Sequence, residues 1–223
     1  MILEGRIKGL VFDLDNTLYR DPANKNSIFA QAAAHTALQM GAGMSFADAV
    51  RMAEQSYVDH ESEAVAFCLA FGFDKKRFYH HVHEFGVELM LQAIHPVEAY
   101  REAFNRLSTT LDVRILTHGS QRWAERLVAH LGYHAVLRED CLLGLDHPKI
   151  AERRKDQGPE VFEAVAGIMG LRPNEICVVE DTLDNLIIPH QMGMQTVYVH
   201  WGKALPDKPD YVTAQVSDFT ELN

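Results

Sequence analysis

The chain has 223 residues, of which 47% are hydrophobic and 23% are charged. These are ordinary values for a globular protein, and they exclude a disordered chain, a collagen-like repeat and a disulfide-stapled miniprotein. Lys and Arg number 21 against 31 Asp and Glu, so the net charge is −10. This charge repels polyphosphate backbones, so we expect no nucleic-acid partner, although it does not exclude a small phosphorylated ligand.

The three cysteines are scattered along the chain, at Cys68, Cys141 and Cys177. Their odd number and the lack of CxxC spacing argue against a metal knuckle or a disulfide framework and favour a reducing compartment. The first residues lack the apolar segment and cleavage site of a signal peptide. No apolar run approaches the roughly 20 residues that span a bilayer. We therefore predict a cytoplasmic protein with no membrane partner.

Short apolar runs recur along the chain, and each stops at a polar cluster. They cover residues 7–14, 113–116, 176–179 and 196–199. Helical patterns separate them, and strands that alternate with helices indicate a parallel α/β sheet. The predicted fold class is therefore a Rossmann-like parallel sheet flanked by helices. Ligands of such sheets bind beyond the carboxyl ends of the strands, where the polar clusters fall.

One long segment, residues 20–105, shows helical periods and no convincing strand. Ser45 followed by Asp48 resembles a capping box and predicts one helix start. Further helices are expected to begin near Ala23, Asp74 and Pro96. The helix near Asp74 carries an apolar stripe of Phe78, Val82, Phe85 and Leu89. We predict an all-helical cap domain over 20–105, inserted into a catalytic core formed by 1–19 and 106–223.

Acidic residues stand at two of the predicted strand ends. Asp13 and Asp15 are two residues apart, so an extended backbone would send both side chains to the same side. Two such carboxylates repel each other unless a cation lies between them, and Asp181 could supply a further acidic ligand. Three carboxylates without His or Cys favour Mg²⁺ over Zn²⁺. The alternative is a simple polar turn, which is common at the junction between a strand and a loop.

Four motifs in order carry a resemblance to a known family. Residues 11–19, VFDLDNTLY, resemble the first motif of the haloacid dehalogenase-like (HAD) hydrolases almost residue for residue. Residues 115–120, ILTHGS, and 178–185, VVEDTLDN, are similar to the second and fourth motifs, and Lys155 to the lysine of the third. The resemblance covers essentially the whole chain and includes the place where family members carry a helical cap.

The resemblance implies a reaction. Asp13 would attack phosphorus and form an aspartyl-phosphate, and Asp15 would protonate the leaving oxygen and then take a proton from water. Mg²⁺ would be held by Asp13, the main-chain carbonyl of Asp15 and Asp181. Phosphoryl oxygens would be bound by a group of residues that share one strand end and its neighbourhood: Thr117, His118, Gly119 and Lys155. The dehalogenase branch lacks an acid at the position of Asp15, so the phosphatase branch is favoured.

The lysine and the fourth motif depart from the family pattern. Lys155 lies four residues before Pro159, one more than usual, so Lys149 and a neighbouring Arg are rival phosphate ligands. Within the fourth motif Glu180 and Asn185 replace more usual residues, and Asp184 could contribute instead. Pro189 lacks the N–H that a helix requires, so the following helix is expected to start late or to kink.

The sequence specifies the substrate less closely than it specifies the reaction. Residues 12–19, with Asn16 and Tyr19, and an all-helical cap of this length resemble the pyrimidine 5′-nucleotidase-like group, which implies UMP or CMP as substrate. A sugar phosphate or another small phosphorylated metabolite is the nearest rival, followed by a phosphomutase reaction. A protein that binds without turnover is the alternative from another class. The sequence leaves open whether the chain is a monomer or a homodimer.

Overall fold

The computed structural model describes residues 2–222, which divide into two compact units. We call them the α/β unit, formed by the chain up to Arg20 and from Pro96 onward, and the helical unit, Asp21–His95. The helical unit ends at His95, whereas the helical pattern of the sequence predicts an end at residue 105. The difference arises because helix α5 (Glu98–Thr110) packs on the sheet, where the Phe104 ring lies 6.0 Å from that of Phe12.

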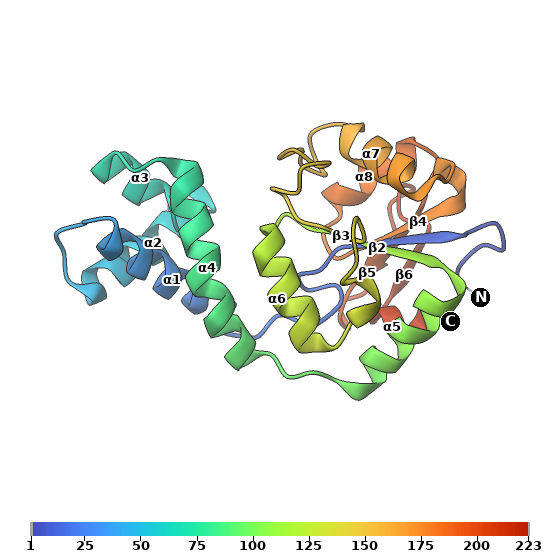
Figure 1. Cartoon of the computed structure of the whole chain (residues 1–223), viewed down its shortest axis with the longest axis horizontal. Coiled ribbons are helices and arrows are strands. Elements are labelled where there is room, and N and C mark those ends of the chain that lie inside the picture. Colours follow the sequence, from blue (N-terminus) through green and yellow to red (C-terminus); the bar gives the residue numbers. More distant parts are fainter. Residues whose placement is uncertain (1, 223) are drawn as a thin grey trace. The chain divides into compact units, whose positions relative to one another are not determined.

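The α/β unit contains a parallel six-stranded sheet in the order β3-β2-β1-β4-β5-β6, in which β1 is central (Figure 1). The strands are β1 (Gly9–Phe12), β2 (Asp112–Leu116), β3 (Leu142–Leu143), β4 (Ile176–Glu180), β5 (Gln195–Val199) and β6 (Ala214–Val216). The predicted parallel α/β class is confirmed. Strands β3 and β6 were not predicted, because two or three residues are too few to show a pattern of alternation.

Helices cover both faces of this sheet, so the unit has three layers (Figure 1). Besides α5, they are α6 (Gln121–Leu131), α7 (Glu160–Met169) and α8 (Asp184–Gln191), with short 3-10 turns η1 (His134–Val136), η2 (Pro173–Glu175) and η3 (Phe219–Leu222). Alternate residues of β1 face opposite layers. Val11 belongs to the cluster that contains Phe162 of α7, whereas Phe12 packs against Phe104 and Phe219.

The helical unit consists of α1 (Lys25–Gln39), α2 (Phe46–His60), α3 (Val65–Phe71) and α4 (Lys75–Ala93). The predicted helix starts are confirmed at Ser45 and Asp74, whose side chains accept hydrogen bonds from the amides of Asp48 and Arg77. Alanines from α1 and α2 fill much of its core, which lets these helices approach closely. The short helix α3 was not predicted.

The predicted stripe of α4 is half correct. Phe78 and Val82 are buried, but the buried face continues through Val87 and Met90 rather than through Phe85 and Leu89. Phe85 is only partly buried and stacks on the ring of His35 at 5.8 Å. The buried residues Phe78, Val82, Gly86 and Met90 are spaced four apart, so the buried face drifts around a helix that has 3.6 residues per turn.

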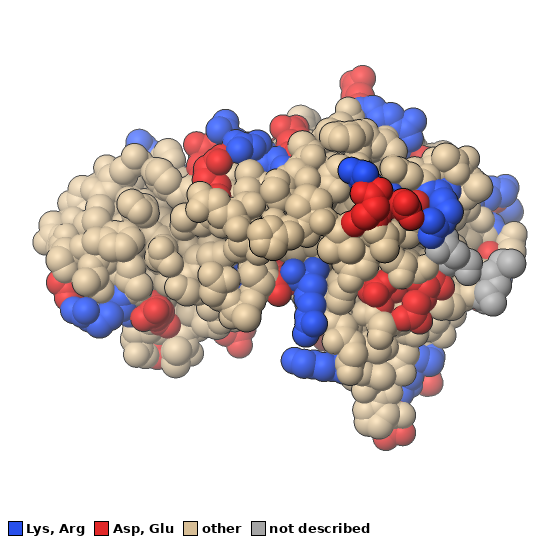
Figure 2. Space-filling model, turned by 90° about the horizontal axis from the view of Figure 1, so that it is seen from below, with Lys and Arg blue, Asp and Glu red and all other residues tan. Residues whose placement is uncertain are grey.

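Within residues 2–222, none of the helices has both the length and the apolar character needed to cross a membrane. On the face drawn in Figure 2, acidic and basic side chains form small, interspersed groups on a mostly uncharged surface.

Candidate active site

The order of the strands brings three motifs together at one edge of the sheet. Strands β2 and β4 flank β1, with Phe12 in register with Ile115 on one side and Val179 on the other. The next residue of each strand is therefore close to the same edge. The Asp13 amide continues the ladder by donating to the carbonyl of Val179 at 2.9 Å. Parallel pairing thus converts motifs separated by more than a hundred residues into neighbours.

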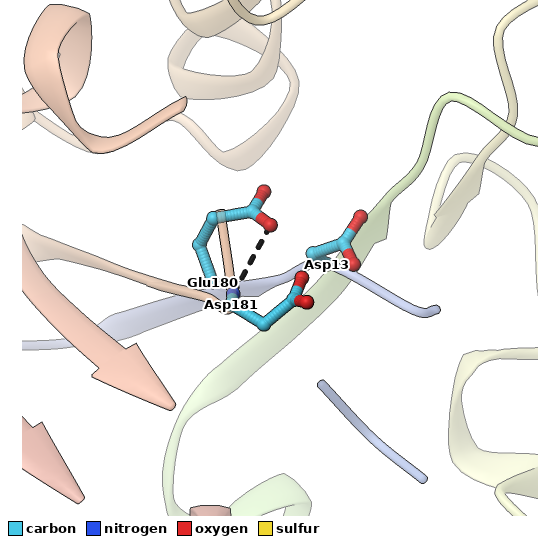
Figure 3. Close-up of side chains that lie close together, drawn as sticks. All are labelled: Asp13, Glu180 and Asp181. Atoms are coloured by element: carbon cyan, nitrogen blue, oxygen red, sulfur yellow. Dashed lines mark hydrogen bonds between the residues drawn. The ribbon is translucent and has the colours of Figure 1, made fainter. Parts of the chain in front are cut away.

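A buried charge cluster lies at this edge. It consists of Asp13, Glu180, Asp181 and Lys155. The three acidic residues each offer a carboxylate oxygen, and these oxygens lie within 4.8 Å of one another (Figure 3). The Lys155 Nζ lies 2.6 Å from Asp13 Oδ1 and 2.5 Å from Glu180 Oε2. Lys155 is 3% exposed and Glu180 is 1% exposed, so this ion pair is shielded from water.

Burial of these carboxylates disfavours their charged forms. Desolvation raises the pKa of Asp13, and the nearby Glu180 carboxylate raises it further. Desolvation and the charge of Asp13 raise the pKa of Asp181 to about 6. Burial alone would lower the pKa of Lys155, but Asp13 and Glu180 outweigh it and raise that pKa. The cluster therefore has one firmly held positive charge against three acids, and a further cation would relieve it.

Asp181 is oriented by the segment that follows Asp13. The Asn16 side-chain amide donates to Asp181 Oδ2 at 2.7 Å. The Asn16 backbone has a φ of 58°, a left-handed conformation that Asn tolerates better than most residues. Its carbonyl accepts a hydrogen bond from the Trp201 indole at 2.5 Å. Trp201 thus holds the loop that contains Asp13 and Asp15.

Asp15 has different surroundings, because its carboxylate contacts neutral donors. Asp15 Oδ1 accepts from the Tyr19 hydroxyl at 2.5 Å and from Trp123 Nε1 at 2.9 Å. Asp15 Oδ2 accepts from the Thr117 hydroxyl at 3.2 Å. The carboxylate of Asp15 is thus not part of the group of three acids. Binding of Mg²⁺ by the main-chain carbonyl of Asp15 stays a prediction.

The second motif supports this edge of the sheet from β2. Thr117 is buried, and its hydroxyl accepts from the Gly119 amide at 3.0 Å. A Cβ on Gly119 would stand 2.6 Å from Trp123 Cδ1, so glycine allows the indole to lie against this loop. His118 Nε2 accepts from the Lys155 amide at 3.0 Å. That contact positions the loop of Lys155, and the expected contact of His118 with substrate stays a prediction.

His118 is neutral in this position. Burial lowers the pKa of His118 to about 3, and the charge of Lys155 lowers it in the same direction. A neutral imidazole has one nitrogen that can accept a hydrogen bond, as Nε2 does here.

The structure separates the rival cations. Lys149 is exposed and pairs with Asp140 at 2.5 Å, and Arg154 pairs with Asp156. Lys155 is the one of these three that enters the charge cluster. The extra residue before Pro159 therefore does not prevent Lys155 from reaching Asp13, and its contact with phosphate remains a prediction.

Glu180 is a functional candidate that was not predicted from the sequence. Its Oε1 accepts from the amides of Asp181 and Thr182, both at 3.1 Å, and its Oε2 accepts from Asn185 Nδ2 at 3.2 Å. A charged residue at the end of an all-apolar strand, directly before Asp181, was the available signal. Asp184 is instead exposed at the start of α8.

The helix that follows the fourth motif does not start late. It begins at Asp184 and passes through Pro189 to Gln191. Pro189 is buried, and its carbonyl accepts from the Met194 amide at 2.9 Å, so the chain is held beyond the proline.

The donor set fits a hard divalent cation. Carboxylate oxygens are the ligands that Mg²⁺ prefers. Glu180 already accepts from Lys155, Asn185 and two amides, so Asp13 and Asp181 are the acids with the more available oxygens. Their raised pKa values are the expected consequence of gathering acids where a cation belongs.

Comparison with solved structures supports the fold. Similar structures include CbbY from Rhodobacter sphaeroides in complex with phosphate, with a TM-score of 0.68, 15% identity, and coverage of 97% of this chain and 96% of that chain. A haloacid dehalogenase-like family protein, SP0104 from Streptococcus pneumoniae, has a TM-score of 0.63 and 16% identity, and the match covers 98% of each chain. A Thermotoga maritima protein assigned as a beta-phosphoglucomutase has a TM-score of 0.60 and 17% identity, and the match covers 94% of each chain. At these identities the matches establish the fold alone.

Comparison of sequences identifies the family. A search of the curated proteins finds no match. The family model described as haloacid dehalogenase-like hydrolase matches residues 7–193, which is most of the chain and includes every motif discussed above. The chain belongs to the haloacid dehalogenase-like hydrolases.

Proposed function

We propose that this hydrolase is a Mg²⁺-dependent phosphomonoesterase that acts through a transient aspartyl-phosphate, an acyl phosphate, on Asp13. The observation that carries the proposal is the separation of two acids on one short loop. Asp13 lies in a buried charge cluster with Lys155, whereas Asp15 is held outside that cluster by neutral donors. The first arrangement suits a nucleophile that a cation must shield, and the second suits a group that exchanges a proton.

The chain's residues divide the reaction into two steps. An Asp13 oxygen forms a bond to phosphorus while the bond to the leaving oxygen breaks, and Asp15 gives that oxygen a proton. Water then attacks the same phosphorus, Asp15 takes its proton back, and the bond to Asp13 breaks to release inorganic phosphate. The protons balance over the two steps because Asp15 ends as it began.

Positive charge must offset the meeting of a carboxylate with a phosphate dianion. Mg²⁺, held by Asp13 and Asp181, would supply that charge as a Lewis acid. Lys155 and Thr117 are the residues we assign to the phosphoryl oxygens, because the Lys155 ammonium contacts Asp13 and the Thr117 hydroxyl contacts Asp15. The single Thr117 proton, which is donated to Asp15 in this structure, would turn to the phosphoryl group when substrate binds. The amide of Gly119 donates to Thr117 and so orients that hydroxyl.

A dehalogenase reaction is the rival within the family, since several similar structures are described as dehalogenases. A halide leaves without a proton, so that reaction has no use for an acid at Asp15. The hydroxyl, indole and threonine contacts to Asp15 therefore support the phosphatase reaction over the dehalogenase reaction.

For the substrate we propose a small phosphorylated metabolite. The first motif supports a nucleoside 5′-monophosphate such as UMP or CMP, and nothing in the comparisons adds to that support. A sugar phosphate is the second candidate, and the similarity to a protein assigned as a beta-phosphoglucomutase favours it.

The reaction is tested by measuring inorganic phosphate released from p-nitrophenyl phosphate, with Mg²⁺ and after treatment with EDTA. We expect release that EDTA abolishes and Mg²⁺ restores. No release under any metal condition would favour a protein that binds without turnover. A panel of nucleoside monophosphates and sugar phosphates then ranks kcat/KM, and values no better for UMP or CMP than for sugar phosphates would remove the nucleotidase assignment.

A further inference from the structure

Two aromatic side chains to which no role has yet been assigned donate hydrogen bonds to the same oxygen of Asp15. The Tyr19 hydroxyl and the Trp123 indole both donate to Asp15 Oδ1, at 2.5 and 2.9 Å. Both side chains are buried, each 2% exposed, whereas Asp15 itself is half-buried. The acid is thus fixed on its inner side and accessible on another.

The two donors are themselves held in place. Trp123 is in the first turn of α6, where its amide donates to the capping Ser120 hydroxyl at 3.2 Å, and its ring lies against Gly119. Tyr19 follows Leu18, whose carbonyl accepts from the buried Tyr133 hydroxyl at 2.7 Å. Neither donor can follow Asp15 far if that side chain rotates.

The contacts of Asp15 distinguish its two oxygens. A carboxylate offers about four lone-pair sites, two on each oxygen. The Tyr19 and Trp123 donors fill both sites on Oδ1, while Thr117 fills one site on Oδ2. At least one site on Oδ2 is therefore left for a proton or for the oxygen with which the proton is exchanged, whether or not Thr117 turns to the phosphoryl group.

We propose that Trp123 and Tyr19 are positioning residues for the acid–base step, and that they direct proton exchange to Asp15 Oδ2. The inference rests on the proposed phosphatase function. By occupying Oδ1 they prevent rotation of the carboxylate and keep the proton on the oxygen that faces away from the aromatic pair. Their effect on catalysis passes entirely through Asp15.

A positioning role for an acid has a specific kinetic consequence. A leaving phenol that is already acidic needs little protonation, whereas a weakly acidic phenol depends on the proton from Asp15. The value of kcat/KM covers the steps up to departure of that group, so hydrolysis of the intermediate does not enter. Misplacing Asp15 should therefore lower kcat/KM progressively as the leaving phenol becomes less acidic.

The test uses a series of aryl phosphates with phenols of graded acidity, with Trp123→Phe and Tyr19→Phe as variants. Each substitution removes one donor and keeps an aromatic ring. We expect a loss of about tenfold or more on the least acidic phenol and a much smaller loss on p-nitrophenyl phosphate. Thr196→Val is the matched control, because it removes a buried hydroxyl in β5 that donates to the carbonyl of Tyr211 rather than to Asp15, and it should leave the dependence on the leaving group unchanged.

The Asp15→Asn background provides a second measurement. If Trp123 acts through Asp15, then Trp123→Phe should add no further dependence on the leaving group once Asp15 is gone. Urea unfolding of each variant shows whether it folds, and Tyr19→Phe serves if Trp123→Phe does not.

The outcomes separate the inference from the proposed function. Wild-type protein that releases no phosphate from any ester would remove the proposed function and the inference with it. If wild type is active and Asp15→Asn steepens the dependence, but both aromatic variants lose activity equally on all esters, the function stands and the aromatic pair is merely structural. A steeper dependence in either folded variant, absent in Thr196→Val, supports the inference.

Discussion

Asp13 and Asp15 are two residues apart, yet their carboxylates lie in opposite kinds of surroundings. Around Asp13 the partners are ionic, with the Lys155 ammonium at 2.6 Å and two further acids within 4.8 Å. Around Asp15 they are neutral, namely a phenol, an indole and a threonine hydroxyl. The same chemical group thus lies in a charged cluster at one position and among neutral hydrogen-bond donors at the other.

The comparison shows how one loop can carry two different roles. Carboxylates take distinct functions when their environments differ, and position in the sheet decides the environment. Asp13 continues β1 and so meets the end of β4, whereas Asp15 has already left the ladder and meets the start of α6. The pattern DxD therefore encodes two sites rather than a single pair.

The largest effect is expected from Asp13→Asn, which should abolish turnover because an amide oxygen cannot replace the nucleophile. The fold should survive, since Lys155 still pairs with Glu180 and one buried negative charge is removed. Phosphate release and urea unfolding, measured on the same preparation, check both parts. Turnover near that of wild type would show that the charged cluster is not the site of covalent chemistry.

Asp15→Asn should lower kcat/KM by about 10² to 10⁴, the usual contribution of general acid–base catalysis. The substitution keeps the shape of the side chain but removes the exchangeable proton. The exposed Asp207, changed to Asn in the same way, is the matched control and should have no effect. A loss as complete as that of Asp13→Asn would collapse the distinction between the two acids, and no loss would remove the role of Asp15.

The sequence predicts the positions of strand ends better than it predicts their contacts. Asp13, Thr117 and Asp181 follow apolar runs, so a general rule about parallel sheets places them together. Glu180 and Trp123 could not be assigned in this way. Glu180 faces Lys155 because β4 extends one residue beyond the apolar run, to Glu180 itself. Trp123 reaches Asp15 because of the way α6 starts after Gly119.

The same limit explains the missed elements of the fold. Helix α3 spans seven residues and β3 spans two, so neither is long enough to show a period. The boundary at residue 105 was wrong for a related reason. A helical pattern shows that 98–110 is a helix, but it does not show that this helix packs on the sheet rather than among the other helices.

Lys155→Ala sharpens the ionic side of the comparison. It should lower kcat/KM by about 10² to 10³, as the loss of one group that stabilises the phosphoryl charge does elsewhere. It should also destabilise the fold by about 3 to 5 kcal/mol, because Asp13 and Glu180 would stay buried without their cation. Lys149→Ala is the control and should change neither quantity appreciably, since that exposed lysine pairs with Asp140. Equal effects of the two substitutions would contradict the assignment.

The smallest effect concerns the imidazole that supports the loop of Lys155. In the folded protein burial lowers the pKa of His118 from 6.5 to about 3, so the unfolded chain binds a proton in this range that the folded chain refuses. The contribution to stability is therefore complete above pH 6.5 and is lost as the pH falls toward 3. At about 1.4 kcal/mol per pH unit, lowering the pH to about 5 should cost about 2 kcal/mol of unfolding free energy.

His118→Gln isolates this contribution, because glutamine can still accept from the Lys155 amide but does not titrate. The free energy of unfolding, measured by urea unfolding and plotted against pH, should run parallel for the two proteins above about pH 7. The two plots should converge as the pH falls, because wild type loses stability faster. The acids of the cluster titrate in both proteins, so the difference between the curves removes them. Parallel curves down to about pH 5 would mean that His118 is solvated rather than buried, and the loop that places Lys155 beside Asp13 would then need another anchor.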